Sequence, residues 1–183
     1  MKLGPTTEKF VLHWGEMGTR WGVNRTVAQI HALLYLSPEP LNAETIAETL
    51  GVARSNVSTS LRELQSWGLV RVVHVLGDRR DHFESLSDIW DIFMAVVEER
   101  KRRELDPTLT TLRECVLEAE SDQSIDAEVR TRIQDTLEFM ELLTDWYGQM
   151  KTLPRPVIVR ILKLGAGLQN LLGRGRKSGE AAS

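Results

Sequence analysis

The stretch AETLGVARSNVSTSLRELQSWGLV, residues 47–70, contains the end of one helical pattern and the whole of another, separated by a glycine. The first predicted helix spans residues 43–50, with Asn42 as its N-cap. The second spans residues 53–67, and its apolar residues recur at helical spacing. Gly51 suits the left-handed backbone of a tight turn between them. Two short helices joined in this way predict a helix-turn-helix.

A β-hairpin is predicted directly after this pair of helices. Residues 69–76, LVRVVHVL, are rich in valine and alternate as a strand does. The following GDRR, residues 77–80, contains turn formers, and residues 81–85 can return as the second strand. A helix-turn-helix followed by a hairpin is a winged helix, and its wing carries arginines at the tip.

Helical patterns flank this unit on both sides. We expect a mainly α fold, a winged helix-turn-helix with a two-stranded wing, flanked by long dimerisation helices. We expect an N-terminal helix in residues 1–24, the winged helix-turn-helix domain in 25–86, a helical dimerisation or regulatory region in 87–172 and a disordered tail in 173–183. Further helices are predicted at residues 6–21, 24–36, 87–105, 108–119 and 126–151. The last carries a heptad-like seam formed by Ile133, Leu137, Met140, Thr144 and Tyr147.

Composition and charge restrict the class of protein. The chain has 183 residues and a net charge of −3, which argues against a generic nucleic-acid-coating protein. Residues 41–85 hold five arginines and six acidic residues, so positive charge must be clustered by the fold. No apolar run is long enough to cross a membrane, and residues 1–10 lack an apolar signal core. We therefore expect a cytoplasmic protein without a membrane partner.

The start of the second helix has the chemistry of a DNA-reading surface. Recognition helices place their first residues against base edges in the major groove. Arg54 can bond guanine through two donors, and Asn56 can bond adenine. The alternative is a solvated helix face, although serine and threonine are poor helix formers. The other outward residues of this helix are predicted to be Ser55, Ser58, Thr59, Ser60 and Arg62.

The wing offers a second possible contact with DNA. Arg80, with Arg79 beside it, can enter the minor groove, which is narrow and strongly negative over A·T tracts. Asp78 lies two residues before Arg80 and can orient its guanidinium through a salt bridge. The alternative is a turn whose arginines serve solubility alone.

Residues 47–70 and GDRRDHF, residues 77–83, resemble the MarR superfamily of winged-helix regulators, with Asp78 and Arg80 as the Asp-x-Arg of the wing. FVLHWGEMGTRWGVNRTVAQIHALLYLSPEPL before them and ERKRRELDPTLTTLREC after them are similar to the GbsR type. The resemblance implies a homodimeric repressor that binds a pseudo-palindromic operator in double-stranded DNA. It also implies dimerisation through terminal helices and, in some members, a small-molecule effector.

Several other features carry two interpretations. Trp14, Trp21, Trp67 and Trp90 are favoured as core residues, but they could form an aromatic cage for a quaternary ammonium effector. The basic ERKRRE, residues 99–104, either forms surface pairs or contacts phosphates. The lone Cys115 is interpreted as an inert thiol rather than a redox sensor.

The predicted function is therefore a sequence-specific transcriptional regulator. The alternative from another class is a winged helix that binds proteins and not DNA. An enzyme is not expected, because no nucleophile–base pair or phosphate loop is present in the sequence. The histidines lack metal-ligand spacing, so neither a metal nor a cofactor is expected.

Overall fold

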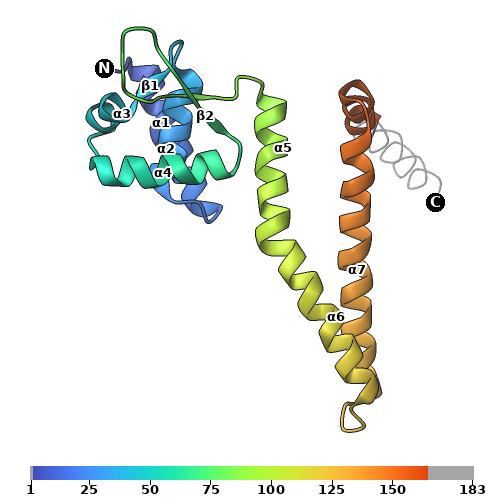
Figure 1. Ribbon diagram of the computed structural model, residues 1–183. Coiled ribbons are helices and arrows are strands. Elements are labelled where there is room, and N and C mark those ends of the chain that lie inside the picture. Colours follow the sequence, from blue (N-terminus) through green and yellow to red (C-terminus); the bar gives the residue numbers. More distant parts are fainter. Residues whose placement is uncertain (1, 165–183) are drawn as a thin grey trace, which may run out of the picture. The chain divides into compact units, whose positions relative to one another are not determined.

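The computed structural model describes residues 2–164, which form two compact units that divide between Arg103 and Glu104 (Figure 1). The sequence had instead placed a boundary between residues 86 and 87, so the helix that follows the wing stays with the first unit. The expected disordered tail, residues 173–183, lies outside the described residues.

Four helices in the first unit agree with the sequence prediction to within a few residues. They are α1 (Pro5–Arg20), α2 (Arg25–Leu36), α3 (Ala43–Leu50) and α4 (Arg54–Ser66). Asn24 Oδ1 accepts a hydrogen bond from Thr26 N at 2.8 Å, and Asn42 Oδ1 accepts one from Thr45 N at 3.0 Å. Gly51 ends α3 with φ +65°, the left-handed conformation that the turn requires.

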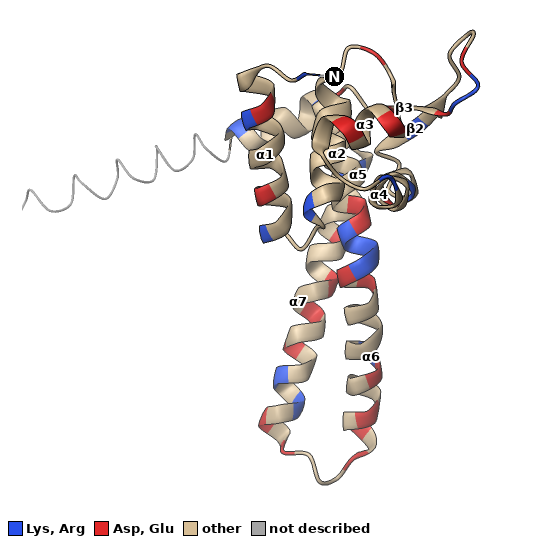
Figure 2. Ribbon diagram, turned by 90° about the vertical axis from the view of Figure 1, so that its left-hand side faces the viewer, with Lys and Arg blue, Asp and Glu red and all other residues tan. Residues whose placement is uncertain are grey.

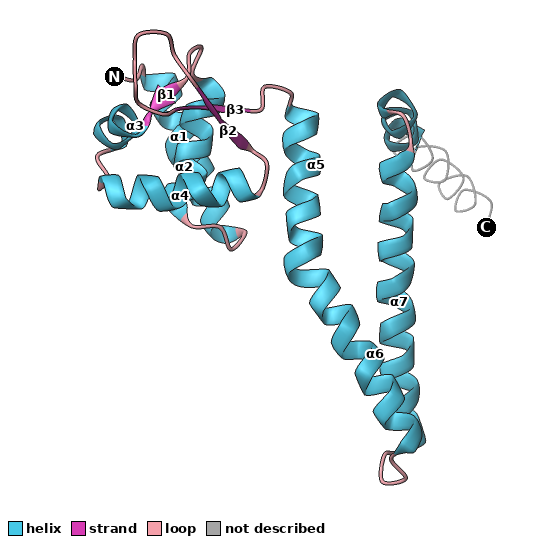
Figure 3. Cartoon of the chain, viewed as in Figure 1, coloured by secondary structure: helices cyan, strands magenta, loops and turns pink. Residues whose placement is uncertain are grey.

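The wing belongs to a sheet of three strands rather than two (Figure 3). These are β1 (Leu41–Asn42), β2 (Val70–Val73) and β3 (His82–Ser85), in the antiparallel order β1-β3-β2. Phe83 faces Leu41 on one side and Val72 on the other. The wing itself is two-stranded as predicted, but β1 was missed because two residues between a turn and a helix cap show no strand periodicity.

A single apolar core fixes the helix-turn-helix. Ile30 and Leu33 of α2, Ile46 of α3 and Leu61 and Leu64 of α4 are almost completely buried. Because these residues anchor one face of α4, the opposite face of that helix is directed outward. The core therefore decides which residues of α4 can meet a partner.

Residues 89–121 are helical without interruption. They comprise α5 (Ile89–Arg100), a π-helical turn η1 (Lys101–Leu105) and α6 (Asp106–Ser121). The helix predicted from residue 87 begins at Ile89, because Asp88 caps it by accepting the hydrogen bond from Trp90 N at 2.7 Å. The predicted break near residue 106 is also absent. Pro107 cannot donate to the preceding turn, and the widened π turn carries the helix past it.

The second unit is built on contacts between α6 and α7 (Ala127–Thr152), followed by a helical segment at residues 155–164. Asp126 caps α7 by accepting from Glu128 N at 2.8 Å. The predicted seam of α7 is its least exposed face, with Leu137 buried, and its partner within the chain is α6. Within residues 2–164, no helix is both long and apolar enough to cross a membrane.

Candidate nucleic-acid interface

The N-terminal half of α4 presents a row of polar side chains to solvent. Val57, Leu61 and Leu64 bury one face of the helix, so the residues between them point outward. One prediction was wrong: Ser60 is only 5% exposed, because it falls three residues after Val57 on the buried face. The exposed residues are Arg54, Ser55, Asn56, Ser58, Thr59 and Arg62.

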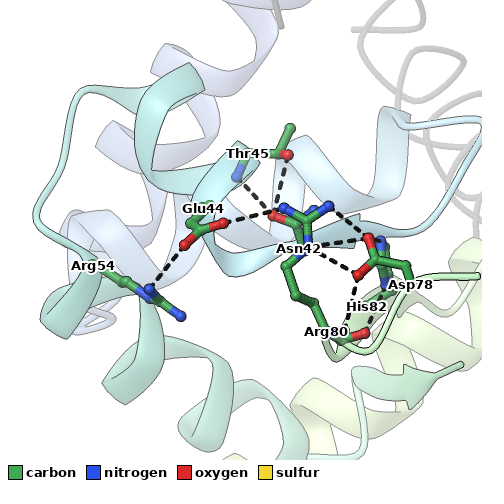
Figure 4. Close-up of polar contacts among 7 residues, drawn as sticks. All are labelled: Asn42, Glu44, Thr45, Arg54, Asp78, Arg80 and His82. Carbon is green, nitrogen blue, oxygen red and sulfur yellow. Dashed lines mark hydrogen bonds and ion pairs between the residues drawn. The ribbon is translucent and has the colours of Figure 1, made fainter. Parts of the chain in front are cut away.

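The two arginines predicted to reach different grooves share one carboxylate. Glu44, in the first turn of α3, accepts a hydrogen bond from Arg54 Nη1 on Oε1 at 2.9 Å. Its other oxygen, Oε2, accepts one from Arg80 Nη1 at 3.1 Å. Figure 4 shows Glu44 between the start of α4 and the wing. The side chains remain partly exposed, so an incoming ligand can reach both arginines.

Asp78 holds the other edge of the Arg80 guanidinium. Arg80 Nε lies 3.0 Å from each carboxylate oxygen of Asp78, and Nη2 donates to Oδ2 at 2.6 Å. The backbone N–H of Arg80 also donates to Oδ1 at 3.0 Å. These bonds hold the pKa of Asp78 well below its usual range and raise that of Arg80. The predicted salt bridge is present, with geometry that fixes the guanidinium plane.

His82 supports this arrangement from β3. Its side chain is buried, with Nδ1 3.0 Å from the carbonyl oxygen of Arg80 and Nε2 3.5 Å from Asp78 Oδ2. Sequence reasoning identified neither His82 nor Glu44 as part of the site. A residue spacing of four hints at the Asp78–His82 contact, whereas Glu44 and Arg80 are 36 positions apart and show no local signal.

The remaining arginines of the interface are less constrained. Arg62 Nη2 donates to Thr59 Oγ1 at 3.4 Å, and Arg79 is exposed in the wing loop. Figure 2 shows acidic residues on α3 and both signs of charge along the wing loop. The face is therefore of mixed charge, and the positive charge that was expected to cluster there is offset by the acidic neighbours of Arg54 and Arg80.

An apolar cavity of about 280 Å³ lies within the first unit, between α1, α2, α4 and α5. Trp14, Trp21 and Trp67 line it, as the aromatic-cage hypothesis required. Trp90 does not; its ring instead lies 5.9 Å from that of Phe93, which does line the cavity.

His31 is the polar side chain most deeply set in the cavity wall. It is 5% exposed, and its Nε2 has no hydrogen-bond partner. Burial lowers its pKa from 6.5 to about 4, so the ring is neutral at physiological pH. A neutral imidazole with an unused nitrogen can bind a polar group of a ligand by one hydrogen bond.

The basic cluster at residues 99–104 packs onto the tryptophans of the cavity wall. Arg100 lies 5.5 Å above the Trp21 ring and donates to the Trp21 carbonyl, while Arg103 lies 5.9 Å from the Trp67 ring. Arg102 Nη2 pairs with the buried Glu99 at 2.5 Å. The Arg102–Glu99 ion pair fits the pairing interpretation of the cluster, whereas Arg100 and Arg103 contact tryptophans, which that interpretation did not include.

Cys115 is a half-buried free thiol on α6. Within the described part of the chain, no group of three histidine, cysteine, aspartate or glutamate residues is placed to hold a metal ion.

Comparisons with known proteins agree with this geometry. The sequence profile of the MarR family matches residues 21–81, which span α2 to the wing. The HTH-type transcriptional repressor GbsR of Bacillus subtilis (strain 168) is 20% identical over 136 residues, covering 71% of this chain and 75% of that protein. A crystal structure described as a transcriptional regulator aligns with a TM-score of 0.62 at 20% identity, covering 87% of this chain and 99% of that one. This last similarity shows the fold.

Proposed function

We propose, from the match of residues 21–81 to the MarR family and the similarity to the repressor GbsR, that this chain is a GbsR-like member of that family and a sequence-specific transcriptional regulator of double-stranded DNA. It acts as a homodimeric repressor at a pseudo-palindromic operator. The observation that carries the proposal is the outward polar face of α4, placed beside a wing that carries a fixed arginine. Membership of a family of regulators also supports the expectation that the chain is not an enzyme.

In this proposal, α4 enters the major groove. Arg54 and Asn56 stand in the first turn of the helix, where side chains reach base edges, and both are exposed. The hydroxyls of Ser55, Ser58 and Thr59 bind phosphates or bases, and Arg62 extends the same face.

The wing enters the adjacent minor groove with Arg80 leading and Arg79 beside it. Asp78 keeps the Arg80 guanidinium in one orientation, which lowers the entropy lost when it inserts. Minor-groove arginines favour narrow A·T-rich segments. Each operator half-site is therefore expected to contain a segment that α4 contacts in the major groove, flanked by an A·T tract that the wing contacts in the minor groove.

Dimerisation is supported by apolar side chains that α7 leaves exposed. Leu142 is 66% exposed and Trp146 58% exposed, on the side of α7 opposite its seam with α6. Such a face is typical of an interface, and a second copy of the chain would bury it. A dimer that places two α4 helices one DNA turn apart explains a pseudo-palindromic site.

We also propose that the apolar cavity holds a small-molecule effector. The guanidinium groups of Arg100 and Arg103 already lie over the rings of Trp21 and Trp67. A quaternary ammonium ligand would compete with these cations for the same rings, so a neutral, largely apolar molecule suits the cavity better. Because it acts on DNA, we place the regulator in the cytoplasm.

The experiment that tests the function is selection of duplexes from a random library by the purified protein, followed by fluorescence anisotropy across a salt series. We expect one enriched sequence with two inverted half-sites, bound more tightly than random duplex, with an affinity that falls steeply with salt. If selection enriches no sequence, the winged helix is a protein-interaction module instead.

A further inference from the structure

We propose that Glu44 sets the DNA specificity of this protein by neutralising Arg54 and Arg80 until a matching base sequence replaces it. The inference rests on the proposed DNA-binding function. In this role Glu44 touches no base itself and acts through the two arginines, so it is a positioning residue.

The position of Glu44 is fixed by the fold. It lies in the first turn of α3, whose start is held by the Asn42 cap and whose buried face is anchored by Ile46. From there its two oxygens diverge, one toward Arg54 at 2.9 Å and the other toward Arg80 at 3.1 Å (Figure 4). One side chain thus connects the recognition helix to the wing.

The charges of this cluster cancel. Arg54 and Arg80 contribute two positive charges, and Glu44 and Asp78 contribute two negative ones. Each Nη1 that faces Glu44 retains one further N–H, but the electrostatic attraction for a passing phosphate is strongly reduced. These two arginines therefore gain little from unspecific contact with the DNA backbone.

A correct operator changes this balance. A phosphate oxygen that displaces Glu44 only replaces one anion with another, and its hydrogen bonds with the arginines are no better than those of the carboxylate. A guanine edge offers two acceptors to Arg54, and a narrow minor groove surrounds Arg80 with negative potential. These contacts compensate for the lost ion pairs only where the base sequence matches. Glu44 therefore weakens binding to random DNA more than it weakens binding to the operator.

The test compares Glu44→Gln with Glu48→Gln, using the full chain. Glu48 lies one turn further along α3 and is exposed, so its substitution changes the net charge equally without touching the arginines. Each variant is titrated with a random-sequence 30-bp duplex and with the duplex selected by the wild type. Thermal melts followed by circular dichroism establish that both variants are folded.

We expect Glu44→Gln to bind the random duplex about three- to thirtyfold more tightly than the wild type, the range that two exposed ion pairs represent. Its slope of log K against log salt should steepen by about one to two, because one or two more phosphates are engaged. Affinity for the selected duplex should rise less, so the ratio of specific to random binding falls. Glu48→Gln should change the affinity for both duplexes slightly and to the same extent.

Two results would overturn the inference while leaving the proposed function intact. The first is identical behaviour of Glu44→Gln and Glu48→Gln on random duplex. The second is weaker binding of Glu44→Gln to the selected duplex without a gain on the random one, which would make Glu44 a purely structural support. A wild type for which the selection enriches no duplex would instead overturn the proposed function itself.

Discussion

Gly18 of α1 and Ala28 of α2 approach so closely that a Cβ at residue 18 would lie 2.6 Å from the Ala28 methyl carbon. Both residues are buried, and both line the apolar cavity. Glycine at position 18 is therefore required by the distance between the two helices, because an added methyl group would meet a side chain that has no rotamer to change.

The first prediction is that Gly18→Ala destabilises the protein. The substitution gains up to about 1 kcal/mol of helix propensity, but the clash with Ala28 forces α1 away at a cost of about 2–3 kcal/mol. We expect the free energy of unfolding in urea to fall by about 1–2 kcal/mol. Gly15→Ala is the matched control, since its nearest neighbour is the flexible side chain of Gln29. Equal losses for the two variants would show that helix spacing is not the cause.

The elements that could be predicted from the sequence are those specified by local chemistry. Asn24 and Asn42 cap the helices that follow them, and Gly51 adopts the left-handed turn, because each of these depends on neighbours within a few residues. The wing followed from a valine-rich strand and a turn. Strand β1 could not be predicted, because it pairs with β3 some 40 positions away and has only two residues.

Most residues of the candidate site could be named from the sequence one by one, but most of the contacts among them could not. Arg54 and Arg80 were identified from their places in the helix and the wing, and the Asp78–Arg80 pair from its spacing. The Glu44 bridge depends on how α3 meets the wing in three dimensions. Ser60 was misplaced because its polarity suggested exposure, whereas the period of α4 buries it.

The second prediction concerns the wing. Arg80→Gln should lower affinity for the selected duplex at least tenfold, because it removes the charge directed at the minor groove. Dimerisation and stability should be unchanged, since the side chain is half exposed and contributes nothing to the core. Anisotropy titrations and light scattering provide the two measurements. Arg71→Gln is the control: Arg71 is an exposed arginine of β2 paired with Glu84 at 2.5 Å. A comparable loss in both variants would mean that general charge, rather than the wing contact, governs binding.

The third prediction concerns the exposed face of α7. Leu142→Glu places a charge in the middle of that face and should convert the dimer to a monomer, because an unpaired carboxylate is costly to bury at an interface. Light scattering across a concentration series measures the mass. Gln123→Glu, in the exposed turn between α6 and α7, adds the same charge elsewhere and should leave the mass unchanged. A Leu142→Glu variant that stays dimeric would place the interface on other helices.

The fourth prediction is a loss of stability in mild acid caused by His31. Burial lowers the pKa of this residue from 6.5 to about 4 in the folded state, so between these values the unfolded chain binds the proton more readily. The contribution of neutral His31 to the free energy of unfolding is fully present above pH 6.5. As the pH falls from 6.5 to about 4, the free energy of unfolding declines by about 1.4 kcal/mol per pH unit. Urea titrations at pH 7.5, 6, 5 and 4.5 measure the slope.

His31→Leu should flatten this dependence, because an apolar side chain in the cavity wall has no proton to bind, whatever its effect on stability at neutral pH. His74→Gln is the control, since His74 is an exposed histidine outside the cavity. A neutral ligand that accepts or donates a hydrogen bond at His31 Nε2 should raise the free energy of unfolding in the wild type more than in His31→Leu. If the slope between pH 6.5 and 4.5 is the same in wild type and His31→Leu, then the acid sensitivity arises elsewhere and the cavity histidine is not its source.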